Sequence, residues 1–269
     1  MRLLIFGPGY TASRLIERLA GSARIATVTR ENIGDTARTA FEIAHATHIL
    51  SSVPPSEGDP VLAAYEPLIA ASGAWLGYLS STGVYGDTQG AWVDESAPTD
   101  TGRRSARAEA DARWLALGAR VFRLPGIYGP GRSALDRIPT FRVHAPGQVF
   151  SRVHVDDIAD GVIAGFGGPA GAYNLADNVP APQSEVIAYA CALLRINAPP
   201  LVPLAQADLS PQARAFYSEN RRVANGKAKR VLGWRPRFAD YRLGLRAVNA
   251  MTSPAITSAA PPAASHDQT

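Results

Sequence analysis

Cysteine and long apolar runs are nearly missing from the sequence, and each absence excludes a class of protein. Cys191 is the only cysteine in 269 residues, so the chain cannot form an internal disulfide. Its alanine and leucine neighbours predict a small buried apolar residue and not a nucleophile. No run of 18 apolar residues occurs, and the apolar stretch after Met1 ends at a glycine. We therefore expect no membrane span and no secretion signal, and the expected compartment is the cytoplasm.

Charge is also scarce, at 19% of residues with a net charge of +4. Basic residues form no run long enough to follow a nucleic-acid backbone, and the densest cluster, 227–230 after Arg221 and Arg222, fits a solvated helix face. His45 and His48 lack partners at metal-ligand spacing. Neither a phosphate loop of the Gly-Lys-Ser type nor a nucleophile elbow occurs. These absences predict no nucleic-acid partner, no membrane partner and no metal.

Apolar segments alternate with segments of helical periodicity through the first half of the chain. Continuous apolar strands between helices are typical of a parallel sheet covered on both faces, so the predicted class is α/β. A helix over 156–165 is expected to be capped by Asp156 or Asp157. Strands are predicted over 3–6, 25–28, 47–53, 75–81, 120–124, 153–155 and 173–175, and helices over 10–19, 60–71, 103–117, 156–165, 183–196, 208–217 and 225–232.

A glycine-rich turn connects the first predicted strand to the first helix. Its first glycine permits a tight turn, its second lets the backbone approach a diphosphate, and its alanine lets the helix pack closely on the strand. The amides at the start of the helix would then face the phosphates. Because the motif opens a strand–helix–strand pattern, it predicts a dinucleotide site rather than a bare turn. The residues are Gly7, Pro8, Gly9, Tyr10, Thr11 and Ala12.

The ends of the next two strands bear on which dinucleotide is bound. An acidic residue after the second strand would bind the adenosine ribose, whereas this strand is followed by Arg30, whose guanidinium suits a 2′-phosphate. NADP is therefore the preferred cofactor. The alternative is NAD, with Arg30 a surface residue and Glu31 the ribose ligand. The third strand ends at Ser51, Ser52 and Val53, which could line the adenosine side or simply end the strand.

Several further segments, taken in order, resemble the extended short-chain dehydrogenase/reductase superfamily, whose members include the NAD-dependent epimerases and dehydratases. The likeness extends over nearly the whole chain except its end, and it is nearest to atypical bacterial members with a Gly-Pro-Gly-Tyr fingerprint. Besides the glycine turn, the segments are 78–87, 93–95, 123–131, 153–157, 173–177 and 232–236.

The resemblance implies a doubly wound Rossmann sheet and a small C-terminal α/β substrate lobe. The Rossmann domain would comprise 1–125 and 150–175, and the lobe 126–149 and 176–251. Residues 252–269, rich in Ala, Pro, Ser and Thr, are predicted to be a disordered tail.

The same likeness assigns roles to residues around the nicotinamide. The segment Pro125, Gly126 and Ile127 would run beside the nicotinamide, and Ser81, or alternatively Thr82, would hydrogen-bond the reacting oxygen. Relatives often form homodimers, although no apolar face of 103–117 requires one here.

One part of the family pattern is missing from this chain. The family normally uses a Tyr-x-x-x-Lys pair, but Arg103 stands at the tyrosine position and Arg107 at the lysine position. Arginine stays protonated, so Arg103 cannot act as an ordinary general base. Three alternatives remain: a phenol from Tyr85, a proton shuttle through His144 or His154, or hydride transfer assisted only by the charge of Arg103 and by Ser81. Packing is the expected role of Tyr85.

These observations favour an NAD(P)-dependent oxidoreductase or epimerase/dehydratase-like enzyme that acts on a carbonyl or hydroxyl carbon of a small polar substrate, with sugar-like compounds among the candidates. The alternative is a non-catalytic NADP-binding sensor whose chemistry was lost with the Tyr/Lys pair.

The cofactor assignment gives a first test. Because Arg30 is predicted to bind the 2′-phosphate, the chain should bind NADPH more tightly than NADH. Dissociation constants for the two nucleotides, measured under the same conditions, check this. A clear preference for NADH would overturn the assignment.

Overall fold

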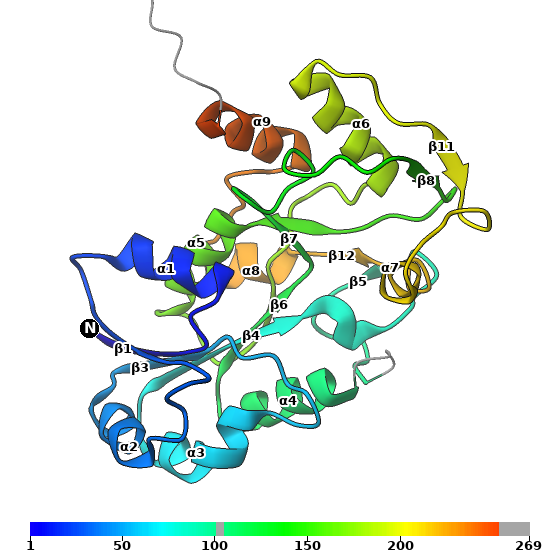
Figure 1. Ribbon diagram of the computed structural model, residues 1–269. Helices are drawn as coiled ribbons and strands as arrows, with labels where there is room; N and C mark the ends of the chain where they lie inside the picture. Colours follow the sequence, from blue (N-terminus) through cyan, green and yellow to red (C-terminus); the bar gives the residue numbers. More distant parts are fainter. Residues whose placement is uncertain (101–104, 253–269) are drawn as a thin grey trace, which may run out of the picture.

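The computed structural model describes residues 1–100 and 105–252 of the chain (Figure 1). The strands are β1 (Arg2–Phe6), β2 (Arg24–Val28), β3 (His48–Ser51), β4 (Trp75–Ser81), β5 (Trp92–Val93), β6 (Arg120–Leu124), β7 (Gly126–Tyr128), β8 (Arg142–His144), β9 (Arg152–His154), β10 (Gly171–Asn174), β11 (Leu201–Pro203) and β12 (Arg222–Val223). The helices are α1 (Tyr10–Leu19), α2 (Thr36–His45), α3 (Pro60–Ala71), the 3-10 helix η1 (Thr82–Tyr85), α4 (Ser105–Ala116), α5 (Val155–Gly165), α6 (Gln183–Leu194), α7 (Pro211–Phe216), α8 (Gly226–Val231) and α9 (Tyr241–Thr252).

A six-stranded parallel sheet forms the centre of the protein, in the order β10-β6-β4-β3-β1-β2. Helices α1, α5 and α8 lie on one face of this sheet and α2, α3 and α4 on the other (Figure 1). The predicted α/β class with a doubly wound Rossmann sheet is therefore confirmed.

Alternate residues of each central strand pack into two separate cores, which explains why the strands read as continuous apolar runs. In β1, Leu3 and Ile5 join the core beneath α1 and α5, whereas Leu4 and Phe6 join the core beneath α2 and α3. All four are 1% exposed or less. A one-residue shift in register would exchange the two sets between the cores, so the pattern fixes the register.

The strand order reverses between β1 and β3, and this reversal locates the crevice where such sheets bind ligands. After β1 the chain adds β2 on one side and then crosses to add β3 on the other. The carboxyl ends of β1 and β3 meet where Ser52 N donates to Phe6 O at 2.9 Å. In sheets of this kind, ligands bind beyond the carboxyl ends of the strands at such a reversal.

A second group of elements lies beyond the carboxyl ends of the sheet (Figure 1). There β8 pairs with β11, and α6 packs against α9 around Tyr128, Val186 and Tyr241. The short pairs β7–β9 and β5–β12 connect this group to the sheet region. The exact residues at which the substrate lobe begins and ends stay a prediction.

The start of α5 holds the two groups of elements together. His154, not Asp156 or Asp157 as predicted, caps this helix, because its Nδ1 accepts the amide of Asp156. The two acids are engaged elsewhere: Asp156 pairs with Arg14 of α1, and Asp157 accepts the amides of Arg237 and Phe238 at 2.6 and 3.1 Å. Both acids are therefore used for tertiary contacts rather than for capping.

Other expectations from the sequence have mixed outcomes. Cys191 is buried at 1% exposure, as predicted. Helices α2 and α9 were not predicted, and α9 continues to Thr252, so the helix includes the first residue assigned to the tail. Residues 253–269 lie outside the described residues. Among residues 1–100 and 105–252, no helix has the length and apolar character needed to cross a bilayer.

Asp177 gives the fold a pH-dependent stability that can be tested. It is 2% exposed, and burial raises its pKa to about 8, although the Val179 amide and Arg152 oppose the shift. A raised pKa in the folded state means stability that is full below about pH 4 and is lost as the pH rises through 8. Asp177→Asn cannot ionise, so its free energy of unfolding should fall less between pH 4 and 8 than that of the wild type.

Urea unfolding at several pH values checks this expectation. Between pH 4 and 8, the free energy of unfolding should fall by at most about 5 kcal/mol more in the wild type than in Asp177→Asn. Asp208→Asn, at an exposed position, serves as the control and should leave the slope unchanged. Equal slopes for Asp177→Asn and the wild type would contradict the assignment.

Candidate dinucleotide-binding site

The glycine turn after β1 is built so that the backbone can approach a ligand closely. Gly7 has φ +74°, and a Cβ there would lie 2.8 Å from Val53 Cγ2, so only glycine fits beside the end of β3. A Cβ at Gly9 would meet nothing within 4 Å, which leaves open space in front of α1. No side chain caps this helix, so amides at its start remain available to a ligand.

The first residues of α1 contact both the sheet and the segment after β7. Ala12 is fully buried against the sheet, as the predicted close packing requires. Tyr10 is half-buried, and its Oη donates to Pro130 O at 3.0 Å. Pro8 O accepts the hydroxyl of Ser13 at 3.2 Å, which supports the turn from behind. Thr11 is partly exposed beside the open space.

The turn after β2 places Arg30 in solvent. Asn32 Oδ1 accepts the Thr29 amide at 2.7 Å, and Glu31 Oε2 accepts the Thr29 hydroxyl at 3.1 Å. Within the described part of the chain, the guanidinium of Arg30 makes no hydrogen bond or ion pair, whereas the Glu31 carboxylate is already engaged. The turn therefore leaves the cation, and not the acid, available to a ligand.

The end of β3 and the segment after β6 lie at two further edges of this crevice. Ser51 is fully buried, and its Oγ lacks a hydrogen-bond partner among the described residues, whereas Ser52 and Val53 are half-buried. Past Pro125, the amide of Gly126 donates to Ser151 O at 3.1 Å and Ile127 continues into the pairing of β7 with β9. The predicted cofactor residues thus come from the ends of β1, β2, β3 and β6.

The end of β4 carries Ser81, which was predicted to face the reacting oxygen, with Ser80 before it and the alternative, Thr82, after it. Ser81 Oγ accepts the Gly83 amide at 3.1 Å and so caps η1, which leaves its own proton free to donate. Ser80 instead turns inward and donates to Asp111 Oδ2 at 2.6 Å. Thr82 is 5% exposed. Of the three hydroxyls, that of Ser81 is the one left half-exposed.

Arg107 is held against the same strand. Its Nη1 donates to Tyr78 Oη at 2.9 Å and to Leu79 O at 3.3 Å, so the cation sits near the carboxyl end of β4. Arg103, its partner in the altered pair, lies outside the described residues.

A buried network surrounds Tyr85 and was not predicted. Arg123 Nη2 pairs with Asp111 Oδ1 at 2.7 Å, and Arg123 Nη1 donates to Tyr85 Oη at 3.0 Å. Tyr85 Oη donates in turn to Asn174 Oδ1 at 2.8 Å. Burial raises the pKa of Tyr85, with Arg123 opposing the shift. This environment suits the packing role expected for Tyr85 better than proton transfer.

The two histidines named as proton shuttles lie in different settings. His154 is fully buried, and burial lowers its pKa to about 4, so it is neutral near pH 7. Its Nδ1 is used in capping α5, and its ring packs on Phe238 with centroids 4.1 Å apart. His144 is exposed on β8. A structural role for His154 accounts for its contacts.

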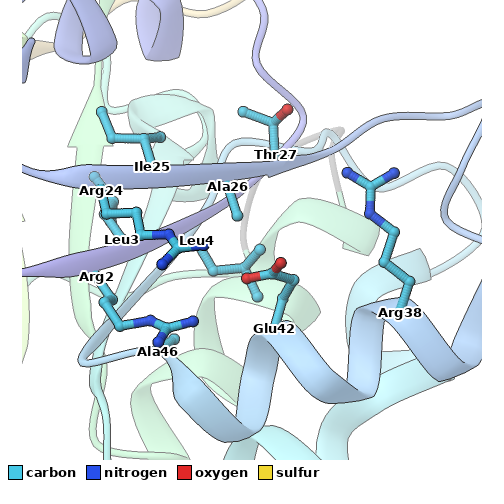
Figure 2. A pocket seen from close by; sticks show the side chains of 10 residues that line it. All are labelled: Arg2, Leu3, Leu4, Arg24, Ile25, Ala26, Thr27, Arg38, Glu42 and Ala46. Atoms are coloured by element: carbon cyan, nitrogen blue, oxygen red, sulfur yellow. The ribbon is translucent and has the colours of Figure 1, made fainter.

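A hollow beside β2 is separate from the predicted site. Figure 2 shows it between the edge strand β2 and α2, with Arg38 and Glu42 projecting from the helix toward the strand. None of the predicted site residues lines it. In the described part of the chain no three His, Cys, Asp or Glu side chains group as metal ligands do.

The order of the parallel sheet is that of a doubly wound Rossmann fold, and solved structures share this fold. A functionally unknown conserved protein from Silicibacter pomeroyi DSS is 42% identical, covers 94% of this chain and 99% of its own, and superposes with a TM-score of 0.85. Human epimerase family protein SDR39U1, solved with NADPH, is 16% identical over 93% of this chain and 99% of its own, with a TM-score of 0.69. This chain belongs to the same family as the Silicibacter protein, and its fold is that of the extended short-chain dehydrogenase/reductase superfamily, as predicted.

Among curated proteins, a 3-diazoavenalumate denitrifying reductase from Streptomyces sp is 29% identical over 178 residues. The match covers 57% of this chain and 58% of the relative, which is less than two thirds of its length. No family model matches the sequence.

Removing the phenol of Tyr85 separates its two candidate roles. Tyr85→Phe should lower the free energy of unfolding by about 2 kcal/mol, because Arg123 and Asn174 each lose a buried partner. NADPH affinity should change less than about twofold. Urea unfolding and fluorescence titration measure the two quantities.

Tyr189→Phe is the matched control, since the half-buried ring of Tyr189 contacts Tyr241 and Arg242 while its hydroxyl makes no hydrogen bond to the described residues. Unchanged stability combined with abolished hydride transfer in Tyr85→Phe would instead identify Tyr85 as the proton donor.

Proposed function

We propose that this protein is an NADP-dependent reductase that transfers a hydride to an electrophilic carbon of a small polar substrate. The observation that carries the proposal is the open, uncapped start of α1 at the point where the strand order reverses. Arg30 supports the phosphorylated cofactor, and the human neighbour, solved with NADPH, supports it further. When bound, the nicotinamide would supply the hydride.

The residues around the crevice fit this cofactor in three places. The amides of Tyr10 and Thr11 would bind the diphosphate, and Arg30 would bind the 2′-phosphate. Ser51, Ser52 and Val53 would line the adenosine side. Pro125, Gly126 and Ile127 would run beside the nicotinamide, next to the half-exposed hydroxyl of Ser81.

Reduction is favoured over epimerisation or dehydration by the acid–base groups that the chain offers. Oxidising a hydroxyl carbon requires a base for its proton, and the chain has Arg103 where a phenol is expected, while Tyr85 is enclosed by Arg123 and Asn174. Adding a hydride to an electron-poor carbon requires only stabilisation of negative charge, which Ser81 and a permanently protonated guanidinium can supply.

The curated relative suggests an acceptor that needs no proton donor at all. It is named for denitrifying reduction of a diazo compound. In such a reaction the hydride pair would form the new C–H bond, and dinitrogen would leave with the electrons of the broken C–N bond. A carboxylate-bearing diazonium compound is therefore the first acceptor class to test.

A non-catalytic NADP sensor is the second candidate, because both members of the proton-relay pair are replaced by arginine. The sensor and the reductase share the cofactor site and differ only in turnover.

The test combines binding and turnover in one preparation. Fluorescence titration should show NADPH binding, and the loss of absorbance at 340 nm should follow hydride transfer to 4-carboxybenzenediazonium or 9,10-phenanthrenequinone after the rate without protein is subtracted. Ser81→Ala should lower turnover at least about tenfold with little change in NADPH affinity, since it removes one hydrogen bond at the reacting atom.

Ser218→Ala, an exposed substitution, is the control and should behave as the wild type. Tight NADPH binding without turnover of any acceptor would favour the sensor, and absence of NADPH and NADH binding would refute both.

A further inference from the structure

We propose that Arg132, in the turn after β7, is a phosphate-binding residue that reaches across to the diphosphate of the dinucleotide. The inference rests on the proposed function, because it assigns a further ligand to the same cofactor. Neither the glycine motif nor the altered Tyr/Lys pair points to this residue.

The turn that carries Arg132 is fastened to the start of α1. Tyr10 Oη donates to Pro130 O at 3.0 Å. A Cβ on Gly129 would lie 2.6 Å from Tyr10 Oη and 2.7 Å from Val155 Cγ1, so only glycine allows this approach. A segment 120 residues away in sequence is thereby placed against the residue that opens the phosphate-facing helix.

The geometry of the turn then directs the arginine. Gly129 and Arg132 exchange backbone hydrogen bonds of 3.2 and 3.1 Å, and Gly131 adopts φ +70° to close the turn. The guanidinium carbon of Arg132 lies 5.5 Å from the centroid of the Tyr10 ring. A cation–π contact of this kind holds a guanidinium in place while leaving its N–H donors unused.

The charges around Arg132 leave it available to an anion. Its side chain is exposed, and among the described residues it forms no hydrogen bond or ion pair. The nearby carboxylate of Asp136 accepts the amide and hydroxyl of Ser133 at 2.6 and 2.7 Å. Arg14, one turn further along α1, is engaged by Asp156 and Glu17. Arg132 is thus a positive charge beside the start of α1 without a fixed acidic partner.

The chemistry of the two arginines predicts different ligand profiles. Arg30 would contact the 2′-phosphate, which NADPH has and NADH lacks. Arg132 would contact the diphosphate, which both nucleotides share, by the charge-assisted hydrogen bonds that guanidinium groups make to phosphate oxygens. Loss of Arg132 should therefore weaken both nucleotides equally, whereas loss of Arg30 should weaken NADPH alone.

The test measures dissociation constants of NADPH and NADH for the full chain and four variants. Arg132→Ala should weaken both nucleotides about tenfold without changing their ratio, and Arg132→Lys should recover part of the loss. Tyr10→Phe, which removes the bond to Pro130 but keeps the ring, should weaken both to a lesser degree. Arg137→Ala changes an exposed arginine in the same loop and should match the wild type.

The outcomes separate this inference from the proposed function. Unchanged affinities in Arg132→Ala, or a loss confined to NADPH, would overturn the role of Arg132 while leaving the reductase proposal intact. A wild-type chain that bound neither nucleotide would overturn both. A loss that disappears at 1 M salt would support the electrostatic contact, because salt of that concentration screens an exposed guanidinium from a phosphate.

Discussion

The buried ion pair of Arg123 and Asp111 is the interaction on which the candidate catalytic end of the sheet depends. Their side chains are 4% and 2% exposed, so both charges have left water and each needs further partners. Ser80 bonds to the carboxylate and Tyr85 to the guanidinium. The pair thereby joins β6 to α4, β4 and η1. The strand end that carries Ser81 cannot shift without disturbing a charge pair that would be costly to expose.

This network also limits the chemistry that the site can perform. A phenol that serves as the acid in hydride transfer must reach substrate, but the oxygen of Tyr85 already lies between Arg123 and Asn174. The family tyrosine position holds Arg103, whose guanidinium stays protonated near neutral pH and cannot act as an ordinary acid or base. In the proposed reductase, the Ser81 hydroxyl and a fixed positive charge would suit acceptors whose reduction leaves a stable anion or a neutral leaving group. The proposal thus rests on these side chains and not on the architecture, which epimerases share.

The sequence predicts this structure best where the signal is local. Helices α1 and α3 and strands β4 and β6 have the predicted bounds, because a glycine turn, a proline at a first helical turn or a short stretch rich in apolar and aromatic residues marks each of them. Helix α2 escaped prediction, since Thr39 and Ile43 are its only buried residues. The capping of α5 by His154 was also missed, because the two acids that follow are the usual cap residues. The network around Tyr85 could not be predicted, since Asn174 is 89 residues away.

The cofactor crevice is closed by contacts between parts of the chain that the sequence does not connect. Tyr10 at the start of α1 bonds to Pro130, and Arg14 one turn further along pairs with Asp156, so α1 contacts the returning chain at both points. Asp157 meanwhile fixes the segment at Arg237 that leads into α9. A ligand bound at the start of α1 would therefore contact the sheet and the loop after β7 together. The binding free energy of such a ligand would depend on how the sheet and the loop are held, so the proposed cofactor site would include the loop.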